Sequence, residues 1–281
     1  MTRLLLCTDL DRTLIPNGAA EESALARKWF STLAADSRVT LVYVTGRHRE
    51  LVEQAIEEYQ LPKADYVISD VGSSIYQVTA ADWLYLSAWE KRISSDWRGK
   101  SADDLQALFD DIKDIRLQEA SKQNTHKLSY YAPLDSDHEK IVSIMGRRLV
   151  QQGIAASLVW SIDQQAGTGL LDVLPASAGK RQAIEFLMAE LGFDISSTLF
   201  AGDSGNDLSV LASPIPSVLV ANADEQTRLA AINQVALNQR PQSLYLARGH
   251  YMGMNGNYSA GILEGVAHYL PEAEQWFRVD S

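Results

Sequence analysis

Cysteine is nearly absent from the sequence, which contains only Cys7. A single cysteine excludes an internal disulfide and a metal site built from cysteines alone. Because Cys7 lies inside a short apolar run, we expect a small buried hydrophobic side chain there and assign it no chemistry.

Long hydrophobic runs are absent as well. No apolar stretch is long enough to cross a bilayer, and Met1-Thr2-Arg3 leads into an expected strand rather than into a signal peptide. There is no internal repeat and no low-complexity linker. These features predict a globular protein of the cytoplasm with no membrane partner.

Positive charge is scarce. The 25 lysines and arginines are outnumbered by 36 aspartates and glutamates, which gives a net charge of −11. Nucleic acids and anionic membrane surfaces would be repelled overall, so we expect neither as a partner. An anionic substrate would require positive charge that is concentrated at its binding site.

Apolar runs and amphipathic helices alternate toward both ends of the chain. With 281 residues, 46% of them hydrophobic, the chain can form one large domain or two unequal ones. The alternation predicts a doubly wound parallel α/β sheet, with strands buried on both faces and a site at their carboxyl ends. The expected strands are 4–8, 39–44, 66–69, 199–201 and 218–221, and the expected helices are 21–35, 49–59 and 181–191.

The middle of the chain has a different pattern. Residues 127–131 and 155–160 resemble half-exposed strands, and residues 103–112 have helical spacing. This mixture predicts a smaller α+β domain with an antiparallel sheet, inserted into the larger domain. The apolar residues 169–175 predict a strand. We expect it to be the first strand after the insertion that belongs to the buried parallel sheet. The expected division is a core of 1–80 and 176–281 and an inserted cap of 81–175.

Two aspartates follow the first expected strand. Side chains alternate along a strand, so Asp9 and Asp11 leave it on the same side. Like charges this close resist joint ionisation unless a cation or a shared proton relieves them. A magnesium ion, with one aspartate as nucleophile and the other as proton carrier, would explain the pair. In isolation, the same pattern also occurs in turns and helix caps.

Two further pieces could bind an anion. Thr45 and Gly46 stand between an expected strand and an expected helix, where a hydroxyl and backbone N–H groups suit a phosphate. A helix cap at Thr45 is the alternative. Lys180 begins a helix, where the helix dipole disfavours a cation, and this mismatch indicates an anion nearby rather than a merely solvated lysine.

Residues 202–207, Gly-Asp-Ser-Gly-Asn-Asp, form the most specific motif. Two glycines permit a tight turn, Asp203 and Asp207 offer carboxylate oxygens, and Asn206 offers an amide. Such oxygen ligands suit an octahedral cation that keeps several waters. A plain turn would explain this segment alone. Its position after the earlier motifs, in this order, favours an active site.

Together these pieces resemble the four motifs of the haloacid dehalogenase superfamily of phosphotransferases, and the insertion resembles its type II cap. More narrowly, nearly the whole chain is similar to the sucrose-phosphate phosphatases. Two positions depart from that pattern, because Arg12 stands where asparagine is common in the family and Ser74 where glutamate is expected. The segments that carry the narrower resemblance are 71–76, 126–131, 172–175, 179–180 and 259–265.

The resemblance implies a role for each motif. Asp9 would attack the phosphorus and form an aspartyl-phosphate, while Asp11 would protonate the leaving sugar oxygen and then deprotonate water. Lys127 and Asp172 of the cap would bind the sugar. The alternative for both is that they are ordinary exposed residues of a strand. Mg²⁺ would be held by Asp9, the backbone carbonyl of Asp11 and Asp203, with Asp207 as a direct or water-mediated ligand. The implied catalytic residues are Asp9, Asp11, Thr45 and Lys180, and the implied substrate-binding residues are Thr45, Gly46, Arg47, Lys127, Asp172 and Asn206.

The favoured function is a Mg²⁺-dependent phosphatase of a sugar phosphate, with sucrose 6-phosphate as the leading substrate. Other phosphorylated disaccharides or glycosides, such as mannosylfructose phosphate and glucosylglycerol phosphate, are alternatives. A phosphomutase of similar fold and a non-catalytic regulatory module are further alternatives, although retention of the motif aspartates counts against the last. We expect a monomer that can associate with a sugar-phosphate synthase.

Overall fold

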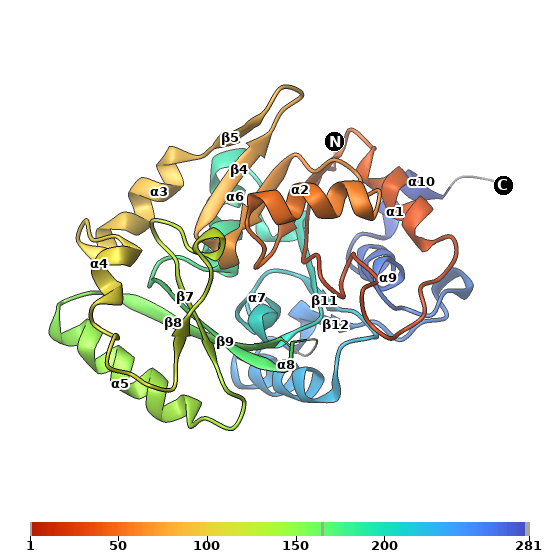
Figure 1. Ribbon diagram of the computed structural model, residues 1–281. Coiled ribbons are helices and arrows are strands. Elements are labelled where there is room, and N and C mark those ends of the chain that lie inside the picture. The colour runs from red at the N-terminus through yellow and green to blue at the C-terminus, as the bar shows by residue number, and fades with distance from the viewer. Residues whose placement is uncertain (1, 164–165, 279–281) are drawn as a thin grey trace.

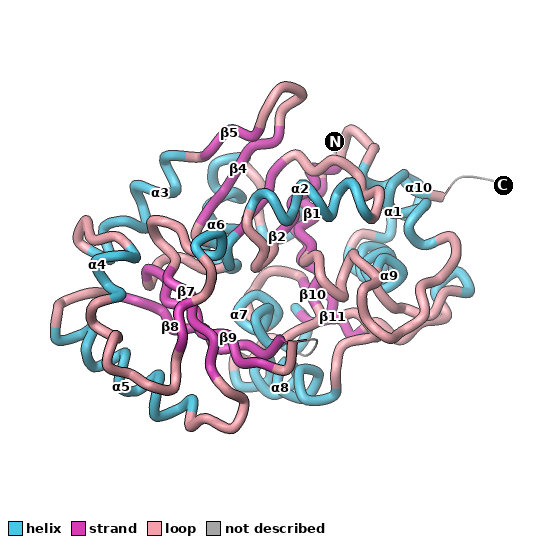
Figure 2. Tube along the Cα trace, in the orientation of Figure 1, coloured by secondary structure: helices cyan, strands magenta, loops and turns pink. Residues whose placement is uncertain are grey.

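The structure is a computed structural model that describes residues 2–163 and 166–278. It contains two β-sheets, a large one in the core and a small one in the cap (Figure 1). Figure 2 shows the strands of both sheets in magenta and the cyan helices that flank them. Within the two described ranges, no helix combines the length and the apolar character needed to cross a bilayer.

The core sheet has eight strands in the order β12-β11-β10-β1-β2-β3-β4-β5. All pairs from β12 to β3 are parallel, and β4 and β5 are antiparallel. The chain runs from β1 to β2 and β3 on one side and returns as β10, β11 and β12 on the other, so a switch point lies between β1 and β10. The predicted doubly wound sheet is confirmed. The strands are β1 Leu4–Thr8, β2 Val39–Val44, β3 Tyr66–Ser69, β4 Ser74–Val78, β5 Trp83–Tyr85, β10 Thr198–Gly202, β11 Ser217–Leu219 and β12 Leu244–Leu246.

Helices cover both faces of this sheet. In β1, Leu4 and Leu6 belong to one buried cluster, while Leu5 and Cys7 belong to another, because alternate side chains point to opposite faces. α1, α2, α9 and α10 contribute to the first cluster, and α6, α7 and α8 to the second. Burial on both faces explains the continuous apolar runs of the parallel strands. The helices are α1 Ala26–Ala34, α2 Arg49–Glu58, α6 Lys180–Leu191, α7 Leu208–Leu211, α8 Glu225–Leu237, α9 Ser259–Tyr269 and α10 Glu274–Phe277.

The first helix begins later than expected, at Ala26 instead of residue 21. The carbonyl of Glu21 accepts hydrogen bonds from the side-chain amides of Asn255 (2.8 Å) and Asn257 (3.0 Å). These contacts come from the other end of the chain. The local helical pattern therefore could not show that residues 21–25 are held outside the helix.

The cap sheet has the order β6-β7-β9-β8 and is antiparallel. Its buried cluster includes Trp97, Leu105 of α4 and Met145 of α5. The expected helix at 103–112 is only partly formed, since α4 ends at Gln106 and the chain continues in turns. The elements between β5 and α6 are α3 Ser87–Ser94, α4 Ala102–Gln106, β6 Arg116–Leu117, β7 Leu128–Ala132, α5 His138–Gln151, β8 Ala156–Asp163 and β9 Thr168–Pro175.

The prediction that the parallel strands return at residues 169–175 is wrong. This segment is β9, which pairs antiparallel with β7 and β8 in the cap sheet. It lies between these two strands and is largely buried, so its apolar run resembles that of a parallel strand. Burial alone does not distinguish a central antiparallel strand from a parallel one.

The core sheet also extends past residue 80, where the expected cap begins. β5 pairs with β4, and Trp89 of α3 then packs against Phe186 of α6 with the ring centroids 5.1 Å apart. We retain the division into core and cap as a proposal, with the crossing into the cap placed after α3. Short 3₁₀ helices complete the chain: η1 Asp70–Gly72, η2 Ser95–Trp97, η3 Ala120–Lys122, η4 Ile195–Ser197, η5 Gly205–Asp207, η6 Pro241–Ser243, η7 Tyr251–Gly253 and η8 Pro271–Ala273.

Candidate active site

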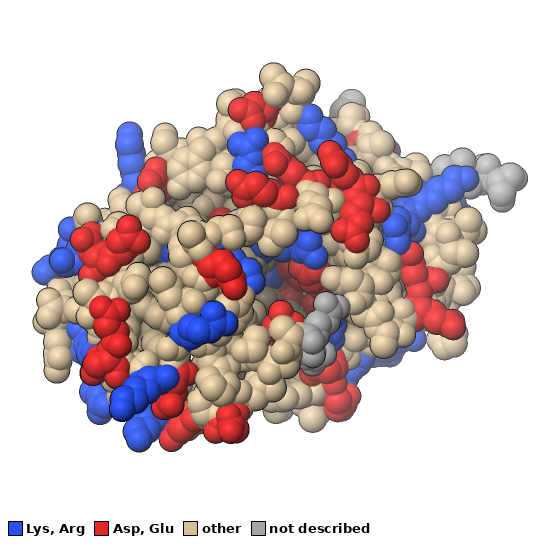
Figure 3. Space-filling view, viewed as in Figure 1, with Lys and Arg blue, Asp and Glu red and all other residues tan. Residues whose placement is uncertain are grey.

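The sequence motifs converge at one edge of the core sheet. Asp9, Thr45 and Asp203 follow β1, β2 and β10, and parallel neighbouring strands end at the same edge. The N–H of Asp9 donates to the carbonyl of Ala201 at 2.9 Å, which ties the loop after β1 to β10. Figure 3 shows a hollow near the centre of the molecule, between the cap sheet and α2, with acidic and basic side chains in its floor.

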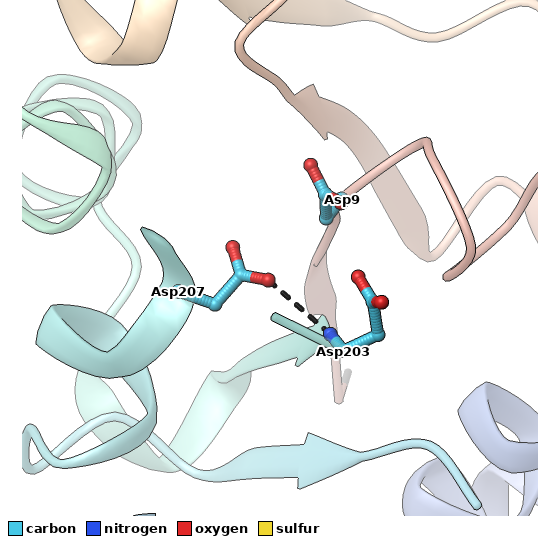
Figure 4. Close-up of side chains that lie close together, drawn as sticks. All are labelled: Asp9, Asp203 and Asp207. Carbon is cyan, nitrogen blue, oxygen red and sulfur yellow. Dashed lines mark hydrogen bonds between the residues drawn. The ribbon is translucent and has the colours of Figure 1, made fainter. Parts of the chain in front are cut away.

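Asp9, Asp203 and Asp207 form a buried acidic cluster (Figure 4). One carboxylate oxygen from each lies within 4.8 Å of the others. Burial is the main cause that raises the pKa of Asp9, and the charges of Asp207 and Asp203 raise it further against the opposing effect of Lys180. Burial, together with Asp207, likewise raises the pKa of Asp203 to about 7.

Lys180 lies inside this cluster and is itself buried. Its Nζ donates to Oδ1 of Asp207 at 2.7 Å, Oδ1 of Asp9 at 2.9 Å and Oδ1 of Asn206 at 3.0 Å. Burial opposes a charged ammonium, but the adjacent carboxylates outweigh it and raise the pKa of Lys180. The lysine at a helix start therefore has carboxylates as its neighbouring anions.

The cluster fits a divalent cation. Lys180 can balance only one of the three carboxylates, and the guanidinium of Arg12 reaches the cluster from its rim, with Nε 3.2 Å from Oδ2 of Asp203. Among the described residues, no donor makes a hydrogen bond of good geometry to that buried oxygen. Excess negative charge and an unsatisfied carboxylate oxygen are features of a site for a hard cation such as Mg²⁺.

Two glycines allow the loops of the cluster to approach one another. A Cβ on Gly202 would lie 2.7 Å from Oδ2 of Asp207, which accepts hydrogen bonds from the backbone N–H groups of Asp203 and Ser204. A Cβ on Gly72 would lie 2.2 Å from the carbonyl carbon of Gly179. Side chains at these two positions would displace the acidic loop and the start of α6.

Asp11 lies beside the cluster, paired with Arg47. Nε and one terminal nitrogen of Arg47 donate to its two oxygens at 2.8 Å and 2.6 Å, and the amide of Asn17 donates at 2.7 Å. Burial alone would raise the pKa of Asp11, but the hydrogen bonds and charge of Arg47, with the Asn17 amide, lower it. The Asp11 side chain is 40% exposed and so can reach a ligand in the hollow.

Thr45 does not cap α2, because His48 occupies the N-cap position. Thr45 is buried, and its Oγ accepts a hydrogen bond from the N–H of Arg47 at 3.2 Å. A Cβ on Gly46 would lie 3.8 Å from Cγ2 of Val71, which is an ordinary van der Waals contact. The Thr45 hydroxyl is thus held by the turn that carries Gly46 and Arg47.

The two expected sugar-binding residues of the cap are buried rather than exposed strand residues. Nζ of Lys127 lies 3.5 Å from Oδ1 of Asp70. Asp172 of β9 accepts a hydrogen bond from the hydroxyl of Ser129, directly opposite on β7. Lys127 and Asp172 therefore each have a protein partner, Asp70 for the ammonium and Ser129 for the carboxylate.

Sequence reasoning missed three polar residues around the site. Asn17 was expected only as part of a turn, yet its amide oxygen also accepts the N–H of Arg12 at 2.8 Å. Asn222 donates to the carbonyl of Arg12 at 2.6 Å. Asp70 belongs to no sequence motif that we used. The Pro-Asn-Gly turn was a signal for Asn17, whereas the pairings of Asn222 and Asp70 left no local signal.

Known proteins are similar to this chain over most of its length. A family profile described as sucrose-6F-phosphate phosphohydrolase matches residues 2–270. A protein of Nitrosococcus oceani, described only as a HAD-like hydrolase, is 51% identical over 98% of this chain and 74% of its own length. Sucrose-phosphatase 2 of Nicotiana tabacum is 28% identical over 95% of this chain, which spans 59% of that relative.

A solved structure supports the same relationship. The sucrose-phosphatase of Synechocystis sp. PCC6803, determined in complex with sucrose and phosphate, has a TM-score of 0.76 at 26% identity and covers 96% of this chain and 98% of its own. The fold and the chain-long family match agree with the convergence of the motif residues. We conclude that this chain belongs to the sucrose-6F-phosphate phosphohydrolase family, a group of phosphoric monoester hydrolases in the haloacid dehalogenase superfamily.

Proposed function

We propose that the chain is a Mg²⁺-dependent phosphatase that converts sucrose 6-phosphate into sucrose and phosphate. One observation carries the proposal, namely the buried cluster of Asp9, Asp203 and Asp207 with Lys180 among its carboxylates. A nucleophilic carboxylate, oxygen ligands for a cation and a fixed ammonium are the components that phosphoryl transfer through an aspartyl-phosphate requires.

Asp9 is the proposed nucleophile. Its carboxylate attacks the phosphorus, an O–P bond to Asp9 forms, and the bond from phosphorus to the sugar oxygen breaks. A water molecule then attacks the same phosphorus, which releases phosphate and regenerates the Asp9 carboxylate. Because burial raises the pKa of Asp9, positive charge must lie next to it for the carboxylate to react.

Asp11 is the proposed proton carrier. It donates a proton to the leaving sugar oxygen in the first step and accepts one from the attacking water in the second. Its pairing with Arg47 favours the carboxylate, which suits the second step. For the first step, we propose that Arg47 turns toward the substrate's phosphoryl oxygens, which leaves Asp11 free to carry a proton.

The phosphoryl oxygens would be bound by the Thr45 hydroxyl, the Gly46 N–H and Lys180, with Asn206 steadying the ammonium through its 3.0 Å contact. Lys180 already has three acceptors, so substrate must replace at least one of them. Charge stabilisation of this kind in a site with little water is usually the largest contribution to catalysis.

Asp9, Asp203, Asp207 and the backbone carbonyl of Asp11 would hold Mg²⁺. When bound, the ion supplies the charge that lets an anionic carboxylate approach an anionic phosphate ester. The unsatisfied oxygen of Asp203 supports this assignment.

The sugar would bind between the core and the cap, where Lys127 and Asp172 offer a donor and an acceptor to hydroxyl groups. Sites that hydrogen-bond a hydroxyl discriminate strongly against ligands that lack it. The cytoplasmic location, a monomeric state and association with a sugar-phosphate synthase stay predictions of the sequence.

A phosphate-release screen tests the function. The panel contains sucrose 6-phosphate, mannosylfructose phosphate, glucosylglycerol phosphate and simple hexose phosphates, each with Mg²⁺ or with EDTA. We expect the highest kcat/KM for sucrose 6-phosphate, only with Mg²⁺ and without any phosphorylated activator. A higher kcat/KM for another panel member would identify that ester as the substrate instead. A requirement for an activator would favour a phosphomutase. Inertness toward every ester would refute the proposal.

A further inference from the structure

Asp70 begins a strained turn that connects β3 to β4 in the core sheet and contacts the cap through Lys127. Asp70 and Val71 have φ angles of 53° and 59°, and Gly72 follows with 95°. The left-handed region is unfavourable for valine because its side chain is branched at Cβ. Strained residues persist where surrounding contacts enforce them, and they cluster at ligand sites.

The strained turn lies directly against the expected phosphate-binding turn. The N–H of Asp70 donates to the carbonyl of Arg47 at 3.0 Å, and the N–H of Val71 donates to the carbonyl of Thr45 at 3.1 Å. Because Arg47 in turn binds the Asp11 carboxylate, the backbone of Asp70 is only one residue removed from the proposed proton carrier.

The side chain of Asp70 points to the cap. Its Oδ1 lies 3.5 Å from Nζ of Lys127, and its Oδ2 accepts a hydrogen bond from the Ser69 hydroxyl at 3.1 Å. The side chains of Lys127 and Asp70 are 6% and 7% exposed. A second contact joins the same segments, since the amide of Asn124 donates to the Ser73 hydroxyl at 3.0 Å.

Lys127 is a buried cation with few partners. Over residues 2–163 and 166–278, Asp70 is the only acceptor within hydrogen-bond distance of its Nζ. An ammonium has three N–H donors, and leaving donors unpaired in a buried place is unfavourable. A ligand rich in hydroxyl oxygens would satisfy the remaining donors.

We propose that Asp70 is a positioning residue, which holds the Lys127 ammonium where it donates to hydroxyl oxygens of the substrate's sugar. The inference rests on the proposed function, because it requires a sugar between the core and the cap. The pair thereby selects hydroxyl-rich phosphate esters over esters of apolar alcohols. A purely structural pair would instead affect all substrates alike.

The test compares sucrose 6-phosphate with p-nitrophenyl phosphate, whose leaving group carries no sugar hydroxyls. The variants are Asp70→Asn, Lys127→Gln and the double variant; asparagine tolerates positive φ, so the turn is kept. Each single change should raise KM for sucrose 6-phosphate by about tenfold or more, since a hydrogen bond from a charged group is lost. The kcat/KM for p-nitrophenyl phosphate should stay within about twofold of the wild-type value.

The double variant should be no worse than Lys127→Gln alone, because Asp70 acts only through Lys127. It also removes both buried charges, so it remains informative if Lys127→Gln leaves Asp70 unpaired and fails to fold. Retained hydrolysis of p-nitrophenyl phosphate reports an intact fold and chemistry.

Asp96→Asn is the matched control. Oδ2 of Asp96 accepts hydrogen bonds from the N–H and hydroxyl of Ser177, both at 2.6 Å, and does not contact Lys127. This variant should keep the wild-type KM for sucrose 6-phosphate. Equal losses on both esters, or independent additive effects of Asp70→Asn and Lys127→Gln, would overturn the inference. A wild-type protein that cleaves no sugar phosphate would instead refute the proposed function.

Discussion

Nζ of Lys180 lies 2.9 Å from Oδ1 of Asp9, although 171 positions separate the two residues in the sequence. The contact exists because β1 and β10 are neighbours in the core sheet and α6 begins at the same edge. It joins the proposed nucleophile to a cation that is buried with it. A substitution of one residue should therefore change the pKa of the other and the stability of the fold.

Replacement of Lys180 by methionine should lower kcat by about 100-fold or more, because a charge-stabilising donor is lost. In EDTA the variant should also lose about 3–5 kcal/mol of unfolding free energy, since buried carboxylates remain without their partner. Mg²⁺ should restore part of this loss. Steady-state kinetics and thermal unfolding with and without Mg²⁺ measure both effects.

Arg181→Met provides the control for the Lys180 variant, because Arg181 is the next residue and its ion pair, with Glu185, lies on the exposed surface. Its kinetics and its response to Mg²⁺ should match the wild type. If Lys180→Met retained normal kcat, the ammonium would have no role in the transfer.

The metal-free protein should lose stability as pH rises. Burial is the main cause that raises the pKa of Asp203 from 3.8 to about 7, so the folded state holds a proton that the unfolded state releases. The stabilising contribution is complete below about pH 4 and is lost as pH rises through about 7. The proposed Mg²⁺ would bind the ionised carboxylate, so its affinity should increase over the same range.

Thermal unfolding in EDTA between pH 4 and pH 8, at about one-unit steps, measures this dependence. Asp203→Asn has no titrating carboxyl at this position, so the stability difference between wild type and variant isolates the contribution of Asp203. A difference that grew in favour of the wild type with rising pH would contradict the assigned sign.

Arg47→Lys should shift the pH profile of kcat/KM toward higher pH. Arg47 is the principal group that lowers the pKa of Asp11, and lysine cannot replace the two-pronged contact. KM should rise as well if Arg47 also binds phosphoryl oxygens. Arg49→Lys is the control, since Arg49 pairs with Glu53 and Asp82 outside the cluster. An unchanged pH profile in Arg47→Lys would show that Arg47 does not set the pKa of the proton carrier.

Gly72→Ala should impair both folding and catalysis. The added Cβ would lie 2.2 Å from the carbonyl carbon of Gly179 and 2.6 Å from the N of Lys180, so the start of α6 must move. Gly99→Ala is matched to it, because Gly99 also has a positive φ, of 76°, but has open space around its Cβ position. Gly99→Ala should therefore cost only about 1 kcal/mol from backbone strain. Equal unfolding free energies and equal kcat values for the two variants would exclude the close contact as the cause.

The motif residues were predictable because each stands in a local pattern that carries its own chemistry. Asp9 follows a buried strand, and Asp203 and Asp207 belong to a glycine turn, so strand order alone was needed to bring them together. The parallel α/β pattern supplied that order. Lys180 was recognised because a cation at a helix start is unfavourable without an anion nearby.

The remaining features depend on distant partners. Lys127 and Asp70 form a pair although they are 57 positions apart in the sequence. Asn222 contacts Arg12 across 210 positions. Neither pair leaves a periodic or compositional signal. β9 was misassigned for a related reason, since its burial comes from neighbours on both sides in the cap sheet rather than from parallel pairing.

The central claim is that Asp9 carries the phosphoryl group during turnover. The direct measurement is an acid quench of the Mg²⁺-loaded protein during hydrolysis of sucrose 6-phosphate labelled on phosphorus, followed by peptide mapping of the label. We predict label on the peptide that contains Asp9, and none in a folded but inactive Asp9→Asn variant. Turnover with no labelled protein after rapid quenching, or with label on a different residue, would contradict the account.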